Sequence, residues 1–191
     1  VSAHIVNERD EPKPSDAYGR SKLAAEQALA EVLAGSATQW TALRPVLVYG
    51  PGVKGNMKRL VELASTPWPL PFANLNNRRS IVSVANVSSA VAHALVEPRC
   101  AGGTFLVADA EPMSIAEIVK VLRQSMGRSP RLLPIPKSPI GALLNLAGKS
   151  AAWTRLTGDL VADTSALTRT GWSPVESTMQ GLTTGSKVKI E

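Results

Sequence analysis

A tyrosine and a lysine stand four positions apart near the start of the chain, in the stretch SDAYGRSKLAAE (residues 15–26). If this stretch is helical, Tyr18 and Lys22 lie on one face, with their Cβ atoms about 5–6 Å apart. A free phenol is a poor base at neutral pH, but a neighbouring ammonium favours the phenolate. The small residues Gly19 and Ser21 leave room for a ligand beside the helix. The pair could therefore take a proton from a carbinol while hydride leaves its carbon.

The elements that must position this pair can be predicted from periodicity and end signals. Apolar residues recur at helical spacing after a capping Ser15 or Asp16 and before Gly35, which predicts a helix. The stretch WTALRPVLVYG (40–50) predicts a buried strand that ends in a turn. A helix followed by a nearly continuous apolar strand indicates an α/β layer with a parallel sheet.

The rest of the chain alternates helix and strand signals. Asn86 is expected to cap one helix, and Ser114 with Glu117 to form a capping box at another. The proline-bearing segment 67–79 predicts a surface loop or lid. Further helices are expected at 55–66, 86–98, 114–127 and in part of 140–158, and further strands at 80–84 and 102–109.

Composition excludes several classes of protein. The net charge of +6 is scattered and aromatic residues make up only 4%, which argues against a nucleic-acid interface. Cys100 with His4 and His93 offers neither an internal disulfide nor metal-ligand spacing. The longest apolar stretch, residues 139–148, is far shorter than the ~20 residues of a membrane span. We therefore expect a cytoplasmic enzyme that binds an anionic small molecule and no metal.

The Tyr18–Lys22 pair is followed, in a familiar order, by TALRPVLVYGPG, RRSIVSVANVSSAVAHAL, GGTFLVAD and GWSP. Together these motifs resemble the extended short-chain dehydrogenase/reductase family, in its NAD-dependent epimerase/dehydratase branch of UDP-glucose 4-epimerase-like proteins. The resemblance covers nearly the whole chain. It implies an α/β fold: the C-terminal part of a Rossmann-type doubly wound parallel sheet, plus a small α/β substrate-binding region. Residues 1–52 and 84–110 would belong to the NAD(P)-binding domain, and residues 53–83 and 111–191 to the nucleotide-sugar region.

The resemblance also implies roles for the residues that would meet the NAD cofactor. Tyr18 would be the catalytic acid/base, and Lys22 would bind the nicotinamide-ribose hydroxyls and assist the tyrosine. Pro45, at the end of the predicted strand, would lie against the nicotinamide. Asn86 stands where the family often has Asp, and either residue can cap a helix.

Substrate contacts follow from the same resemblance. Asn56 and Met57, after the YGPG turn, would be neighbours of the nucleotide-sugar. Arg78 or Arg79, just before the strand at 80–84, would contact its diphosphate, because a guanidinium matches phosphate geometry. Arg155 is a second phosphate candidate.

Two parts of the family pattern are missing from this sequence. Gly50, Gly52 and Gly55 lack the family's GxxGxxG spacing and predict a turn, not a dinucleotide cradle. The family's catalytic Ser or Thr is expected to lie before Val1. We therefore expect a C-terminal portion that is inactive alone and associates with a copy of itself or with the absent half, because unpaired strands expose sheet edge and apolar surface.

The expected activity is NAD-dependent epimerisation at C4 of a UDP-sugar, of the kind used in bacterial polysaccharide synthesis. Tyr18 would deprotonate the C4 hydroxyl, and segment 67–79 would close over the intermediate. A nucleotide-sugar dehydratase or 4-keto reductase of the same family remains an alternative. So does a non-catalytic nucleotide-binding module that keeps the inherited fold.

Overall fold

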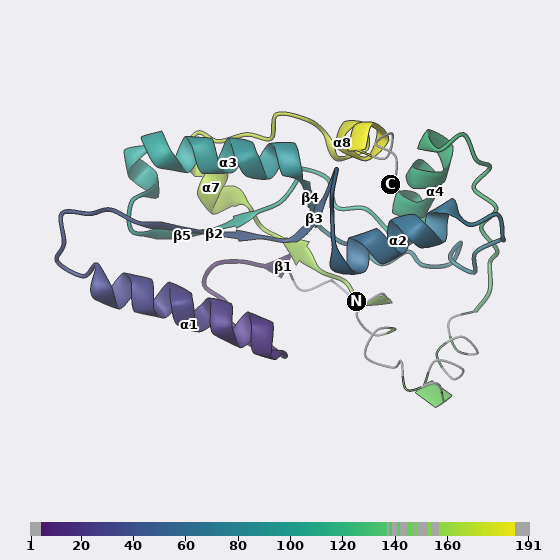
Figure 1. Cartoon of the computed structure of the whole chain (residues 1–191), viewed down its shortest axis with the longest axis horizontal. Coiled ribbons are helices and arrows are strands. Elements are labelled where there is room, and N and C mark those ends of the chain that lie inside the picture. The colour runs from purple at the N-terminus through teal and green to yellow at the C-terminus, as the bar shows by residue number, and fades with distance from the viewer. Residues whose placement is uncertain are drawn as a thin grey trace.

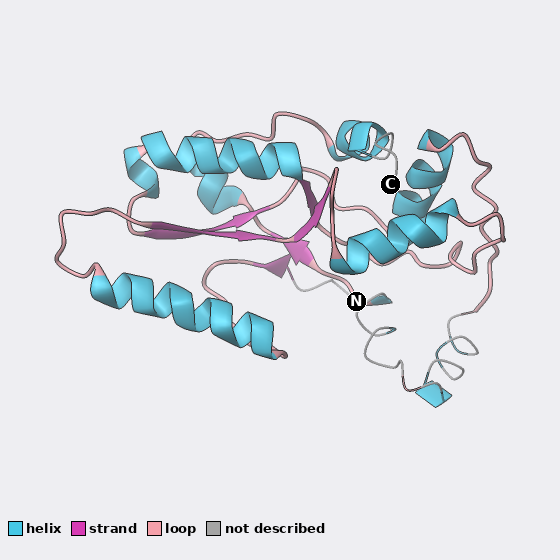
Figure 2. Ribbon diagram, viewed as in Figure 1, coloured by secondary structure: helices cyan, strands magenta, loops and turns pink. Residues whose placement is uncertain are grey.

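A computed structural model describes residues 5–136 and 157–185, together with residues 138, 141, 145, 146, 148 and 153. Parallel strand pairs lie between layers of helices (Figures 1 and 2). The strands are β1 (Ile5–Val6), β2 (Thr41–Pro45), β3 (Leu47–Tyr49), β4 (Ile81–Ser83), β5 (Gly103–Val107) and β6 (Val161–Ala162). The helices are α1 (Ala17–Val32), α2 (Gly55–Ser65), α3 (Val84–Val96), the short 3-10 helix η1 (Pro98–Cys100), α4 (Ile115–Ser125), α7 (Ser165–Arg169) and α8 (Thr178–Gly185). The predicted α/β fold with parallel strands is confirmed.

The predicted strand at 40–50 is divided in two. β2 pairs in parallel with β5, and β3 pairs in parallel with β4. Between them Val46 still donates its N–H to the carbonyl of Val107 at 3.1 Å. The chain therefore changes partner directly after Arg44 and Pro45, where the apolar run is interrupted and Pro45 has no N–H to donate to a strand ladder.

Helices cover both faces of the β2–β5 pair. α3 lies on one face and α1 on the other (Figure 1). Beneath α3 a hydrophobic core forms from buried side chains of α3, β4, β5, α7 and the loops beside them, namely Val82, Ala90, Cys100, Phe105, Val107, Leu167 and Trp172. A second core lies where α2, α4 and α8 gather.

Two predicted helix starts are confirmed. The Asp16 carboxylate accepts the N–H of Gly19 at 2.8 Å and caps α1. Ser114 and Glu117 form the predicted capping box at α4. The prediction for α3 is wrong, because Ser83 caps it by accepting the N–H of Asn86 at 3.0 Å. Asn86 lies one turn further in and is buried, which frees its amide for other contacts.

Segment 67–79 is not a free lid. The side chains of Leu70, Phe72 and Leu75 are buried in the core that α2 and α4 share. Leu70 also donates its N–H to the carbonyl of Arg131 at 3.0 Å. Opening this segment would expose three apolar side chains to water, so the structure corrects the prediction that it closes over a substrate.

The glycines after β3 form the predicted turn into α2. Gly52 and Gly55 have φ values of 73° and 64°, which favour glycine. Gly50 also has a positive φ, 138°, and in addition a Cβ there would lie 3.1 Å from the Val84 side chain. A Cβ on Gly185, in turn, would lie 3.2 Å from the Gly50 Cα. The first glycine of the turn is thus packed against α3 and α8.

Within the described residues, no helix is long and apolar enough to cross a bilayer. The same part of the chain holds no group of three or more His, Cys, Asp and Glu side chains suited to a metal ion.

Candidate functional site

The Tyr18–Lys22 pair occupies the first two turns of α1, as predicted. The Lys22 Nζ lies 5.6 Å from the centre of the Tyr18 ring. The Tyr18 side chain is 71% exposed, so a ligand can reach its hydroxyl. The Asp16 cap fixes the start of the helix that carries both side chains. An accessible phenol and an ammonium thus share one helix face.

A polar clamp attaches α1 to the strands, since α1 has no buried residue of its own. Glu26 accepts two hydrogen bonds from Arg44 of β2, at 2.9 Å from Nε and 2.6 Å from Nη2. The same carboxylate accepts the hydroxyl of Thr104 of β5 at 3.2 Å. A bidentate Arg–carboxylate pair fixes orientation as well as distance, so Glu26 sets how α1 lies on the sheet.

The pair lies at the end of the sheet where ligands of parallel sheets bind. α1 runs opposite to β2, so its first turn lies at the carboxyl end of β2 (Figure 1). Pro45 is the last residue of β2 and is exposed. Ligands of open α/β sheets bind outside the carboxyl ends of the strands. Tyr18, Lys22 and Pro45 therefore belong to the same edge of the molecule.

Asn56 and Met57 have different surroundings. Asn56 is exposed in the first turn of α2. Met57 is 1% exposed and packs in the core with Leu60 and Ala64 on the same helix. The Met57 side chain thus faces the protein interior, and the predicted position of Asn56 and Met57 next to the substrate stays a prediction.

Arg78 and Arg79 tie the segment before β4 to residues far along the chain. The Arg79 Nη1 donates to the Gly158 carbonyl at 3.0 Å, and burial lowers the Arg79 pKa while Asp159 raises it. Arg78 donates its N–H to Asp159 at 2.6 Å, and its guanidinium lies 3.7 Å from Glu117. Arg155 lies outside the described residues, and a phosphate contact by any of the three arginines stays a prediction.

Sequence reasoning missed a buried polar network at the carboxyl ends of β3, β4 and β5. Asp109 accepts the hydroxyl of Tyr49 at 2.7 Å, the N–H of Ser83 at 3.1 Å and the amide of Asn86 at 2.7 Å. Burial, then the Asp109 carboxylate, raises the pKa of Tyr49 well above its usual value. Tyr49 is only 2% exposed. Of the two tyrosines in the chain, Tyr18 alone is open to a ligand.

Asn86 also fastens the segment that leads into α8. Its Oδ1 accepts the N–H groups of Val175 and Glu176 at 2.8 and 3.2 Å. Its Nδ2 donates to Asp109 and to the carbonyl of Glu176 at 3.0 Å. An aspartate here could not donate and would repel Asp109, so the amide suits this position. The signal in the sequence was an asparagine where the family often has aspartate.

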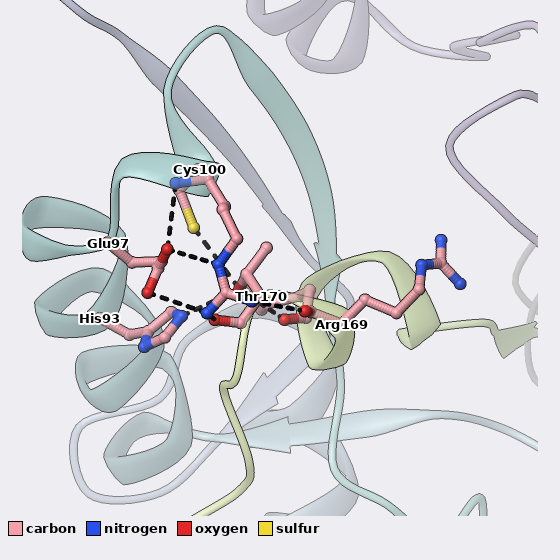
Figure 3. Close-up of polar contacts among 7 residues, drawn as sticks. His93, Glu97, Cys100, Arg169 and Thr170 are labelled. Carbon is pink, nitrogen blue, oxygen red and sulfur yellow. Dashed lines mark hydrogen bonds and ion pairs between the residues drawn. The ribbon is translucent and has the colours of Figure 1, made fainter.

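A second polar cluster holds the end of α7 against α3 (Figure 3). Arg99 donates to the carbonyls of Arg169 and Thr170 at 3.2 and 2.5 Å, and Glu97 orients it from 2.6 Å. The Thr170 hydroxyl donates to the Leu167 carbonyl at 2.6 Å. The remaining partners of that hydroxyl are His93 Nε2 at 2.9 Å and Cys100 Sγ at 3.6 Å, so both act as donors. Cys100 is fully buried, so this cluster is structural.

Comparison with known protein families identifies the family to which this chain belongs. The profile of the NAD dependent epimerase/dehydratase family matches residues 2–108, a span that includes Tyr18, Lys22, Pro45 and all of β2 to β5. The chain belongs to this family. NAD is the family's cofactor. Tyr18, Lys22 and Pro45 are exposed at the end of the sheet where such a ligand binds, and their contact with its nicotinamide stays a prediction.

Relatives within the epimerase family are similar over much of this chain. It is 37% identical over 174 residues to UDP-glucose 4-epimerase of Vibrio cholerae, a match that covers 90% of this chain and 53% of the relative. It is 28% identical over 127 residues to dTDP-L-rhamnose 4-epimerase of Burkholderia thailandensis, over 63% of this chain and 35% of the relative.

Solved structures confirm the partial Rossmann fold. UDP-glucuronic acid 4-epimerase from Bacillus cereus, in complex with NAD, superposes with a TM-score of 0.71 at 21% identity, over 97% of this chain and 55% of that one. UDP-glucose 4-epimerase from Thermotoga maritima, with UDP-glucose, gives 0.70 at 20% identity, over 98% and 57%. The chain therefore spans about half the length of the epimerases that it matches.

Proposed function

We propose that this chain is the part of an NAD-dependent UDP-sugar 4-epimerase that carries the acid/base tyrosine. The observation that carries the proposal is the contrast between the two tyrosines. Tyr18 is exposed beside Lys22 at the carboxyl edge of the sheet, whereas Tyr49 is buried with its proton held by Asp109. The 37% identity to the Vibrio cholerae UDP-glucose 4-epimerase supports the reaction and the substrate class.

The proposed chemistry needs one proton acceptor and a means to hold it. When bound, NAD would supply the acceptor, and later the donor, of the hydride at sugar C4. Tyr18 Oη accepts the proton of the C4 hydroxyl and later gives it back. The Lys22 ammonium stabilises negative charge on Tyr18 and donates to ribose hydroxyls. Pro45 offers an apolar surface against which a nicotinamide ring can lie.

The substrate contacts proposed for this chain are in the first turn of α2, just before β4 and, further along the sequence, at Arg155. Asn56 is exposed and can donate its amide to a sugar hydroxyl. Arg78 or Arg79 supplies a guanidinium group for the diphosphate, and Arg155 is a second candidate. The complete site requires a nucleotide cradle from outside this chain. We therefore propose that the chain alone does not turn over substrate and that its partner is an amino-terminal half or a second copy.

The test uses the complete protein that contains this chain, with a tyrosine-to-phenylalanine pair. Tyr18→Phe is expected to lower kcat for UDP-galactose to UDP-glucose conversion by about 10²–10⁴-fold, the usual share of a general acid/base. Tyr49→Phe is the matched control and is expected to change stability with little effect on kcat. Wild-type turnover in Tyr18→Phe would refute the assignment of Tyr18.

Product analysis separates the epimerase from its alternatives. An NMR time course of the intact enzyme with UDP-glucose should show interconversion without loss of water and without net consumption of NAD. Loss of water would indicate a dehydratase, and net reduction of NAD(P) to NAD(P)H, the reverse of ketone reduction, would indicate a 4-keto reductase. Absence of any conversion would leave a non-catalytic nucleotide-binding module. Conversion of UDP-sugars would be consistent with a role in cytoplasmic polysaccharide precursor synthesis.

A further inference from the structure

The side of α1 that meets the strands carries a charge at its centre. Four residues of α1 are half-buried at spacings of four, three and four positions, namely Gly19, Leu23, Glu26 and Ala30. The residues between them are exposed, so these four form the stripe by which the helix packs on the sheet. Contacts between a helix and a sheet are normally apolar. A carboxylate in the middle of this stripe therefore needs a physical reason.

The partners of Glu26 come from both strands of the β2–β5 pair. Thr104 lies opposite Ala42 in the parallel register, and Arg44 follows Ala42 by two residues. Side chains two apart on a strand point to the same face, so Arg44 and Thr104 both face α1. Glu26 accepts two hydrogen bonds from Arg44 and one from Thr104, at distances from 2.6 to 3.2 Å. One carboxylate on the helix thus holds both strands beneath it.

We propose that Glu26 is a positioning residue for the Tyr18–Lys22 pair, because its bonds to Arg44 and Thr104 fix where α1 carries the phenol over the sheet. This inference rests on the proposed function, in which Tyr18 is the acid/base. Apolar contacts have no direction and let a helix slide or tilt on a sheet. A bidentate carboxylate–guanidinium pair fixes both distance and angle, and setting register is the best-attested use of ion pairs at packed contacts.

The length of the helix between Glu26 and Tyr18 turns a small tilt into a large displacement. Lys22 and Tyr18 precede Glu26 by four and eight residues, which correspond to about 6 and 12 Å along the helix axis. A tilt of about 5° around Glu26 therefore moves Tyr18 by about 1 Å and Lys22 by about half as much. α1 has no buried residue to resist such a tilt. A misplacement of about 1 Å can cost about 10²-fold in rate.

The test uses the complete protein that contains this chain, with kcat expressed per bound NAD so that unfolded molecules do not count. Glu26→Gln keeps the shape of the side chain but loses the charge that holds Arg44. We expect kcat for UDP-galactose to fall by about 10²-fold while KM changes by less than about twofold, because a displaced phenol affects the transition state more than sugar binding.

Two further variants frame this result. Glu31→Gln makes the same chemical change at an exposed position of the same helix and is the matched control, with kcat and KM expected at wild-type values. Thr104→Val removes only the 3.2 Å bond to Glu26 and serves if Glu26→Gln folds poorly. It is expected to lower kcat by a smaller factor than Glu26→Gln and also to leave KM unchanged.

Coupling to Tyr18 separates positioning from a general loss of stability. A residue that acts only through Tyr18 has nothing left to position once the phenol hydroxyl is gone. Glu26→Gln should therefore lower the residual rate of Tyr18→Phe by less than about twofold, whereas an independent defect would multiply the two losses. A second measurement, backbone amide hydrogen exchange, does not depend on turnover. Residues 17–24 of Glu26→Gln should exchange at least about tenfold faster than in the wild type, while α4 and the Glu31→Gln control stay unchanged.

Three results would overturn the proposal. They are wild-type kcat in Glu26→Gln, losses that multiply when Glu26→Gln and Tyr18→Phe are combined, and wild-type hydrogen exchange in α1 of Glu26→Gln. Failure of the proposed function gives a different pattern. Faster exchange in α1 of a protein that does not turn over UDP-sugars would uphold the hold of Glu26 on the helix and refute the epimerase assignment. A slow Tyr18→Phe beside a normal Glu26→Gln would do the reverse.

Discussion

Arg123 provides the sharpest test of what holds together the core shared by α2, α4 and α8. It belongs to α4 and is only 1% exposed. Its guanidinium donates to four backbone carbonyls: Ala64 at 3.2 Å, Thr66 at 3.1 Å, Trp68 at 2.6 Å and Pro130 at 2.8 Å. The first two lie at the carboxyl end of α2, whose last carbonyls need donors. The Arg123 side chain thus joins α4 to the carboxyl end of α2, to the segment that follows α2 and to the loop that follows α4.

The change to make is Arg123→Met, which keeps an apolar stem of similar shape. The two short contacts are each worth about 1.5–3 kcal/mol as hydrogen bonds from a charged donor, and the two longer ones about 0.5–1.5 kcal/mol. The sum is about 4–9 kcal/mol. Three of the four bonds are only partly buried, so water can satisfy those carbonyls after the substitution. We therefore expect a loss of about 4 kcal/mol, near the low end.

Thermal and urea unfolding followed by circular dichroism would measure this loss. For a chain of this length it corresponds to a fall in Tm of about 8–16 °C. Arg128→Met is the control, because Arg128 is exposed on the same stretch and its charge lowers the Arg123 pKa together with burial. It should change stability by less than about 0.5 kcal/mol. An Arg123→Met protein within about 1 kcal/mol of the wild type would refute the reasoning.

Two further predictions concern the polar clusters. Tyr49→Phe removes the hydroxyl that Asp109 accepts at 2.7 Å and should lower the free energy of unfolding by about 1–3 kcal/mol in urea titrations; an unchanged midpoint would mean that the Asp109 network adds nothing to stability. The Arg99 guanidinium, through its hydrogen bond, holds the pKa of Glu97 at about 2, below its ordinary 4.5. A carboxyl group whose pKa is lowered in the folded state stabilises the fold at pH values above its ordinary pKa. That stabilisation is lost as the pH falls toward the pKa of the folded state. The Tm difference between wild type and Glu97→Gln should therefore be constant above pH 4.5 and close as the pH approaches about 2, and a difference that persists at the lower pH would contradict this linkage.

Local signals determined much of the fold. The Asp16 cap, the capping box at Ser114 and the four-residue spacing of Tyr18 and Lys22 act within one or two helical turns. Interactions of that range depend on neighbouring residues alone, so periodicity and end signals were enough to predict them. The parallel arrangement followed in the same way from a helix that precedes an apolar strand.

Tertiary structure decided the contacts and burial of residues whose partners are far along the chain. Asn86 was predicted to cap a helix, but it bonds Asp109 and Val175, which lie 23 and 89 positions away. Segment 67–79 was predicted from its prolines to be a surface loop or lid, yet the core shared by α2 and α4 buries its Leu70, Phe72 and Leu75 side chains. Met57 was predicted to meet substrate and lies in the same core.

The sequence by itself determined that a phenol and an ammonium share a helix face, because helix geometry converts a spacing of four into proximity. It could not determine which of the two tyrosines is open to a ligand. That depended on burial and on a carboxylate 60 positions from Tyr49, which holds one hydroxyl in the interior while Tyr18 stays exposed. Solvent access depends on how distant segments pack, and only the folded chain brings those segments together.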